Sequence, residues 1–236
     1  PDAITTVSAT ADNRAALSPT FLDDARRRWG HGAAAAQELE GKVNWSDEGP
    51  LWTRALLSAC RVASPPPLDR IVVAVDPPAT SGPHADACGL IAAGLREQGD
   101  DGAAYVLADE SLLQASPHAW ARAACQLAAR VGASCIVAEA NMGGEMVRAV
   151  LAAADPHMPV RLVRASMSKR DRAAPIAMRY ANGRDFHVGR FPALEDEMIA
   201  FGAADALSHS PDRLDALVWA LFDLFSNAAA PRLRCL

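Results

Sequence analysis

Three carboxylic acids stand at the ends of apolar segments, where folding can bring them together. Asp76 follows the run IVVAV, Glu139 closes the run CIVA, and Asp215 lies early in a segment whose apolar residues recur at helical spacing. Because carboxylates crowded into a partly desolvated place repel one another, such a cluster requires a cation. Oxygen ligands without His or Cys beside them suit Mg²⁺ or Mn²⁺ and disfavour zinc. The three acids therefore predict a divalent-metal site.

A site of this kind hydrolyses phosphodiesters without a protein nucleophile. With two ions about 4 Å apart, one activates a water molecule and the other stabilises the departing 3′-oxygen. Asp86, on the turn after Asp76, is a further candidate ligand, whereas Asp212 stands beside the expected helix start and is better explained as a cap. Taken singly, Asp76 could start a turn, Glu139 could cap a helix and Asp215 could complement a helix dipole. The prediction depends on all three falling into one topology.

The elements that must position these acids follow a recognisable order. Residues 70–76, 88–95 and 103–109 predict three strands joined by short connections, which is typical of an antiparallel meander. Helices and strands then alternate, with helices expected at 118–131, 144–153, 169–182, 192–201 and 211–226 and strands at 135–140 and 160–164. This order predicts an α/β, ribonuclease-H-like mixed sheet with helices on both faces. Glu139 and Asp76 then end neighbouring parallel strands at one edge of the sheet.

A stiff, proline-rich segment, Ala63-Ser64-Pro65-Pro66-Pro67, predicts a domain boundary. Before it, Ser18 and Pro19 begin a predicted helix that Gly30 closes, and a second helix is expected from Leu51 to Val62. We therefore expect one domain, or the end of one, over residues 1–64 and another over residues 65–236.

Charge is unevenly distributed along the chain. The net charge is −5, yet residues 161–190 hold eight basic residues against Asp171 and Asp185, a local charge of +6. This stretch could form a basic groove that contacts phosphates beside an acidic metal site. The alternative is a solvated helix face in an arginine-rich chain.

The 236-residue chain, half of it hydrophobic, is long enough to bury a sizeable core. Its cysteines lack C-x-x-C spacing, so buried free thiols in a reducing compartment are expected at Cys60, Cys88, Cys125, Cys135 and Cys235. His84, His187 and His209 show no metal-type spacing and are expected in loops. No apolar run approaches the roughly 18 residues that a membrane helix needs, and no signal peptide begins the chain. A soluble, intracellular fragment is expected.

Several segments resemble the nuclease domain of the large terminase family of tailed phages and gene-transfer-agent-like prophages. They are RIVVAVDPPATSG with ADACGLI, IVAEANMGGEMV, SMSKRDRAAPIA, FPALEDEM and SPDRLDALVWAL. The pairing of AEANMGGEMV with SPDRLDALVWAL is the specific feature. The stretches TADNRAALSPTFL and QELEGKVNWSDEGPLW resemble the end of the family's ATPase domain and its bridge to the nuclease.

The resemblance implies an endonuclease that cuts concatemeric double-stranded DNA during viral genome packaging, with low sequence specificity. It implies metal ligands at Asp76, Glu139 and Asp215, with Asp86 as an additional one, and these would hold two Mg²⁺ or Mn²⁺ ions as cofactor. Implied partners are DNA, the protein's own N-terminal ATPase domain, the portal and the small terminase subunit, in the host cytoplasm and without a membrane. Expected DNA contacts are Lys169, Arg170 and Arg172, together with Arg164 and Arg179.

The chain departs from the family in one respect: it contains no G-x-x-x-x-G-K-[ST] loop to cradle a nucleotide. We therefore expect no ATP hydrolysis by this chain. Two alternatives stay open: another ribonuclease-H-like nuclease of the junction-resolvase or transposase type, and a non-catalytic module that docks on the portal or motor.

Overall fold

The computed structural model describes residues 50–78, 87–97, 102–140, 144–202 and 210–226. All of them lie in one compact unit, Pro50–Leu236. The helix predicted to begin at Ser18, the candidate ligand Asp86, two of the histidines and Cys235 fall outside the described residues.

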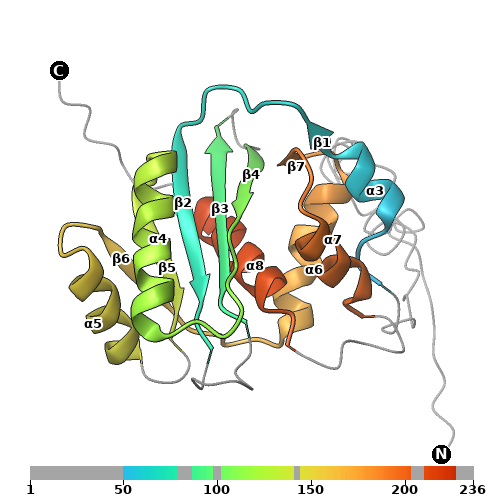
Figure 1. Ribbon diagram of the computed structural model, residues 1–236. Helices are drawn as coiled ribbons and strands as arrows, with labels where there is room; N and C mark the ends of the chain where they lie inside the picture. Colours follow the sequence, from blue (N-terminus) through green and yellow to red (C-terminus); the bar gives the residue numbers. More distant parts are fainter. Residues whose placement is uncertain (1–49, 79–86, 98–101, 141–143, 203–209, 227–236) are drawn as a thin grey trace, which may run out of the picture. The chain divides into compact units, whose positions relative to one another are not determined.

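A mixed sheet forms the centre of this unit (Figure 1). Within the described residues it contains seven strands in the order β1-β7-β4-β3-β2-β5-β6. Their bounds are β1 Arg61–Val62, β2 Arg70–Asp76, β3 Gly89–Arg96, β4 Ala103–Asp109, β5 Cys135–Glu139, β6 Val160–Val163 and β7 Asp185–Val188. Strands β2, β3 and β4 form the antiparallel meander, and β5 and β6 continue parallel to β2. The predicted ribonuclease-H-like order is therefore confirmed.

Helices cover both faces of the sheet, as the sequence predicts. They are α3 Arg54–Ala59, α4 Pro117–Val131, α5 Gly144–Ala154, α6 Lys169–Ala181, α7 Pro192–Ala200 and α8 Asp212–Ser226. Side chains alternate across a strand, so Val72 and Ala74 of β2 join the core under α8 and α6, while Val73 and Val75 join the core under α4 and α5. None of the described helices is long and apolar enough to span a bilayer.

Two strands differ from the prediction. The segment 51–62 is helical only over α3, and its last two residues, Arg61 and Val62, form β1. Strand β7 was not predicted at all, because the side chains of DFHV that point inward are the polar ones, Asp185 and His187. The expectation that His187 lies in a loop is therefore wrong.

The proline-rich segment does not separate two structural units. Trp52 and Leu57 are fully buried in the same core as the sheet, and β1 pairs in parallel with β7. The structural boundary lies before Pro50, and Pro65–Pro67 instead connects the edge strand β1 to the central strand β2. The four described cysteines are free and buried, as predicted.

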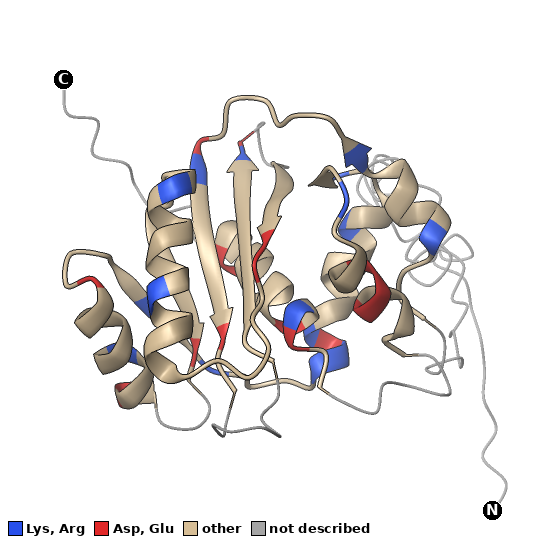
Figure 2. Ribbon diagram, in the orientation of Figure 1, with Lys and Arg blue, Asp and Glu red and all other residues tan. Residues whose placement is uncertain are grey.

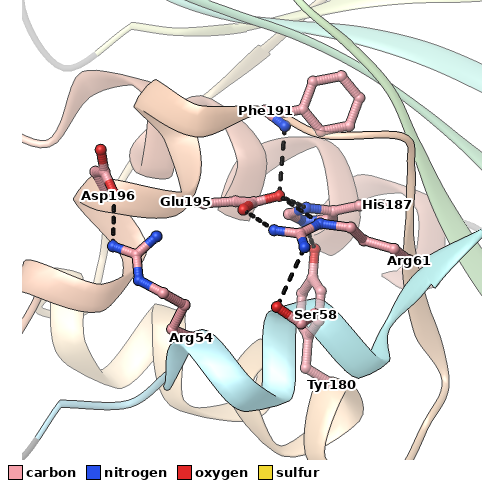
Figure 3. Close-up of polar contacts among 8 residues, drawn as sticks. All are labelled: Arg54, Ser58, Arg61, Tyr180, His187, Phe191, Glu195 and Asp196. Atoms are coloured by element: carbon pink, nitrogen blue, oxygen red, sulfur yellow. Dashed lines mark hydrogen bonds and ion pairs between the residues drawn. The ribbon is translucent and has the colours of Figure 1, made fainter.

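A buried polar cluster fixes the segment 54–62 to the rest of the unit (Figure 3). Arg61 of β1 forms an ion pair with Glu195 of α7, whose side chain is almost fully buried. His187 Nδ1 lies 3.2 Å from Glu195 Oε1, and its Nε2 lies 2.9 Å from the hydroxyl of Tyr180. Since a carboxylate only accepts, Nδ1 carries the hydrogen, and Nε2 accepts from the tyrosine. A neutral His187 with its hydrogen on Nδ1 thus forms hydrogen bonds with both Glu195 and Tyr180.

Burial and the neighbouring charges set the protonation of this cluster. Burial lowers the pKa of His187 from its ordinary 6.5, although Glu195 acts in the opposite direction. Burial alone would raise the pKa of Glu195, but the bonds from Arg61 and His187 outweigh it and hold that pKa below 4.5. The cluster is therefore built for a neutral imidazole and an ionised carboxylate.

Acidification should therefore weaken the fold through His187. The unfolded chain takes up a proton at His187 as pH falls through about 6.5, whereas the folded chain resists it, so stability falls from there towards the lower folded pKa. We expect His187→Gln to reduce the loss of unfolding free energy between pH 7.5 and 5.5, measured by urea denaturation.

The exposed His118 provides the matched control, because His118→Gln should leave the pH dependence of the wild type unchanged. Burial raises the pKa of Asp185 to about 6. Protonation of Asp185 therefore stabilises the fold as pH falls from about 6 towards 3.8. This contribution is the same in the wild type and in His187→Gln. Equal pH slopes for wild type and His187→Gln would contradict the assignment.

Candidate active site

Asp76 and Glu139 lie side by side where two neighbouring strands end. Strands β2 and β5 run parallel with Val75 opposite Ala138, so the next residue of each strand is the acid. Figure 2 shows acidic residues at these two strand ends. The sheet register alone therefore places two of the three predicted acids side by side.

Helix α8 brings the third acid across the same face. Its apolar residues are buried against β2 and β3, and Asp215 in its first turn is only 4% exposed. The helix can approach this closely because β3 begins with Gly89, which pairs with Asp76. A Cβ at Gly89 would lie 2.0 Å from the backbone oxygen of Asp212. The absence of a side chain at Gly89 allows the first turn of α8 to pack directly on the backbone of β3.

The start of α8 is held by an acid from another helix. Glu197 of α7 accepts the backbone N–H groups of Arg213 and Leu214 with Oε2, at 3.0 and 3.2 Å. Arg213 in turn donates to Glu197 Oε1 and forms an ion pair with Asp109, at the end of β4. Glu197 thus performs the capping that the sequence suggested for Asp212, which is buried at the head of α8.

The acids at this edge raise one another's electrostatic free energy. Burial raises the pKa of Asp76 well above 3.8, and the carboxylates of Glu139 and Asp215 raise it further, with a smaller contribution from Asp212. Burial also raises the pKa of Asp215, although Lys169 opposes this effect. Asp212 therefore belongs to the electrostatic environment of the site.

Two basic residues of α6 reach Asp215. Lys169 Nζ lies 2.5 Å from Oδ2 and also contacts the hydroxyl of Ser210. Burial lowers the pKa of Lys169, but its bond to Asp215 and the field of Asp76 outweigh this and raise that pKa. Arg172 Nη2 lies 3.6 Å from Asp215 Oδ1 and is buried. These contacts show that α6 faces the acidic site.

The basic stretch of residues 161–190 does not form the continuous surface that the sequence suggested. Arg172, 5% exposed, is too deeply buried for an outward phosphate contact. Arg179 pairs with Asp185 and donates to the carbonyl of Gly102, at the end of the sheet opposite Asp76. Both residues neutralise buried acids, and their expected contacts with DNA stay untested predictions.

The remaining basic candidates lie nearer the acidic edge, by which we mean the end of the sheet where β2 and β5 finish at Asp76 and Glu139. Arg164 follows β6, whose last residue, Val163, is opposite Glu139, and its side chain is exposed. Arg170 is partly buried at the start of α6, beside Lys169, which is exposed. Arg164, Lys169 and Arg170 therefore lie near the acids, where a contact with a DNA phosphate would require them.

The donor set fits a hard divalent cation, although a complete cage is not preformed. Across the described ranges, no three His, Cys, Asp or Glu side chains converge closely enough to form a ready metal site. Asp215 is engaged by Lys169 and Arg172. A cation bound beside Asp76 and Glu139 would remove the repulsion between these neighbouring acids.

Three contributors to the site were not predicted from the sequence. They are Gly89, which admits α8, Glu197, which caps it, and Trp219, whose Nε1–H donates to Glu139 Oε2 over 2.8 Å. A glycine at the head of an apolar strand is a recognisable sign of close backbone approach. Nothing in the local sequence indicates the other two, since their partners are distant in the chain.

The meander, the parallel crossovers and the acids at one edge together define a ribonuclease-H-like nuclease fold. A family model described as the terminase RNaseH-like domain matches residues 73–224. The chain therefore belongs to the terminase RNaseH-like domain family, which confirms the resemblance seen in its motifs.

Solved structures share this fold at low sequence identity. The nuclease domain of the large terminase subunit gp2 of bacterial virus Sf6 is 17% identical over 73% of this chain and 98% of that chain, with a TM-score of 0.52. The large terminase nuclease from thermophilic phage G20c is 14% identical over 65% of this chain and 81% of its own, with a TM-score of 0.50. The large terminase of another thermophilic bacteriophage, in complex with ATP-gamma-S, is 11% identical with a TM-score of 0.61; the match covers 89% of this chain and 53% of that one. No curated protein matches the chain.

Gly89 provides a test of how α8 is positioned. In Gly89→Ala the new methyl group meets the Asp212 backbone, which cannot rotate away, so we expect a loss of about 1–3 kcal/mol of unfolding free energy. Gly94→Ala in the same strand is the control, because its Cβ meets first the flexible end of Leu68. Denaturation of both variants measures the difference, and a Gly89→Ala variant as stable as Gly94→Ala would contradict the close approach of α8.

Proposed function

We propose that the chain is a metal-dependent endonuclease that hydrolyses the phosphodiester bonds of double-stranded DNA. Its metal ligands are Asp76, Glu139 and Asp215, and its cofactor is Mg²⁺ or Mn²⁺, bound as two ions. The observation that carries the proposal is the placement of Asp76 and Glu139 at the ends of neighbouring parallel strands, with Asp215 buried in the first turn of α8, in a chain of the terminase RNaseH-like family. Asp86 is proposed as an additional ligand.

The chemistry of the donors supports this cofactor. The acids offer only oxygen atoms, which suit Mg²⁺ and Mn²⁺. Structures of one point mutant of the Sf6 large terminase nuclease have been determined with manganese and with calcium. Both ions are hard divalent cations, as Mg²⁺ is. Bound ions would neutralise the three carboxylates and provide an activated water for hydrolysis.

The chain's own residues contribute position and charge. The parallel register of β2 and β5 holds Asp76 and Glu139 together, and α8 carries Asp215 into the same partly buried place. Lys169, 46% exposed, can leave Asp215 for solvent or a DNA phosphate when a cation takes its place. The acids are thus preorganised, and a bound cation would displace the ammonium group of Lys169 from Asp215.

DNA contacts are proposed for Arg164, Lys169 and Arg170, which surround the acidic edge. Contacts of Lys and Arg with phosphates are independent of base sequence. This arrangement supports low sequence specificity, as expected for an enzyme that cuts concatemeric DNA during genome packaging. The net charge of −5 makes local basic residues necessary for any DNA contact.

We further propose that the chain acts with an ATPase domain, the portal and the small terminase subunit in the host cytoplasm. The family assignment and the likeness to a large terminase that was determined with ATP-gamma-S support this context. The assignment of residues 1–64 to the end of an ATPase domain and its bridge, and the absence of ATP hydrolysis, stay predictions.

Plasmid cleavage tests the proposed activity. The purified chain should nick supercoiled plasmid in Mg²⁺ or Mn²⁺ and lose this activity in EDTA. We expect Asp76→Asn to reduce cleavage by more than about 100-fold, because loss of a ligand exceeds the 10- to 100-fold cost of losing a partner that orients one. The variant should fold, since the substitution removes charge repulsion and little volume.

Thermal unfolding supplies a second readout for the same variant. Saturating metal should stabilise the wild type, by about 2.7 kcal/mol at a concentration 100 times Kd, and should not stabilise Asp76→Asn. Asp196→Asn, which alters an exposed ion pair with Arg54, is the control and should behave as wild type. Robust cleavage in EDTA would overturn the metal mechanism, strong preference for four-way junctions would favour a resolvase, and absence of cleavage with metal bound would favour a docking module.

The salt dependence of DNA binding tests the basic edge. The double variant Arg164→Ala, Arg170→Ala should bind duplex DNA more weakly at every sequence and lower the slope of log K against log salt by about 1 for each lost phosphate contact. Arg54→Ala removes an exposed charge from α3 and serves as the control. Fluorescence anisotropy across a salt series measures the slopes, and an unchanged slope in the double variant would exclude these residues from the interface.

A further inference from the structure

Trp219 of α8 reaches the acidic site with its indole nitrogen. Its Nε1–H donates to Glu139 Oε2 over 2.8 Å, and the side chain is almost fully buried. Trp219 follows Asp215 by four residues, so the two side chains share one face of the helix. An indole nitrogen only donates hydrogen bonds, and a carboxylate oxygen is therefore a matched partner.

Arg172 of α6 covers the ring of Trp219. Its guanidinium carbon lies 4.5 Å from the ring centroid, and its Nη2 faces Asp215. Among the described residues, Nε and Nη1 of this buried arginine have no hydrogen-bond partner. Burying unpaired donors costs free energy, so the contacts with Trp219 and Asp215 are the interactions that favour this position. The guanidinium of Arg172, on α6, therefore packs against the indole ring that projects from α8.

We propose that Trp219, supported by Arg172, is a positioning residue that fixes the orientation of Glu139 for binding a divalent cation. This inference rests on the proposed metal-dependent function. One oxygen of Glu139 accepts the indole N–H, so the side chain is held in one orientation before a cation arrives. A ligand that is already ordered loses less conformational freedom on binding.

The direct test is the Trp219→Phe variant of the full 236-residue chain. Phenylalanine keeps an aromatic face for Arg172 and removes the N–H donor to Glu139, together with the volume of one ring. Calorimetric titration with Mn²⁺ should show affinity about 10- to 100-fold weaker than wild type, the usual loss when a group that orients a metal ligand is removed. Unfolding in the absence of metal serves to confirm that the variant is folded.

Trp52→Phe is the matched control. Trp52 is fully buried, and its indole nitrogen has no hydrogen-bond partner among the described residues. The substitution therefore makes the same change of ring in the same core without removing a hydrogen bond. Its affinity for Mn²⁺ should equal that of the wild type.

Indole resonances give a readout that does not depend on a folded variant. The chain has five tryptophans, and the Trp219 and Trp52 N–H signals can be assigned by their loss in the corresponding phenylalanine variants, or through neighbouring assigned nuclei. During a Mg²⁺ titration of the wild type, the Trp219 signal should shift with the midpoint of the calorimetric binding curve, and the Trp52 signal should stay in place.

The outcomes separate this inference from the proposed function. If the wild type binds Mn²⁺ and Asp76→Asn abolishes binding, but Trp219→Phe binds as wild type or the Trp219 signal does not shift, the positioning role is overturned and the metal site remains. If the wild type binds no divalent cation, the proposed function fails and the positioning role fails with it.

Discussion

Electrostatic repulsion among buried carboxylates is the constraint on which the arrangement of this molecule depends. The register of β2 and β5 brings Asp76 and Glu139 together, and α8 adds Asp215 from a third element. Hydrophobic burial on both faces of the sheet provides the free energy that keeps these acids in place. The ammonium group of Lys169, bonded to Asp215, relieves part of this repulsion. A pair of divalent cations would relieve more of it, which links the fold to the proposed chemistry.

Basic residues have two distinct roles in this family member. Arg172 and Arg179 neutralise buried acids and stack on aromatic rings, and Arg161 pairs with the buried Asp223. Arg164 stays exposed beside the acidic edge. The positive charge available for DNA is therefore smaller than the +6 of the sequence stretch, because much of it is consumed internally.

The parts of this structure that local pattern could predict are those where apolar residues dominate. Strands β2 and β4 begin and end at the predicted residues, since continuous apolar runs leave few alternatives. Strand β7 escaped prediction because its inward side chains are Asp185 and His187, whose partners, Arg179 and Glu195, come from other elements. The same applies within the site: strand ends and helix spacing indicate the acids, whereas Trp219 and Glu197 act on residues 80 and 16 positions away. Contacts between distant polar groups leave no periodic trace in a sequence.

The consecutive acids of α7 have a mechanical consequence. Glu195 binds Arg61 on one side, while Glu197 caps α8 on the other, two residues further along the same short helix. A helix of nine residues moves as a stiff rod, so a pull on the segment 54–62 that shifts α7 must also shift or release the first turn of α8. Asp215 stands in that turn. A displacement of the segment 54–62 would therefore reach the end of the sheet that carries the acids through α7 and α8.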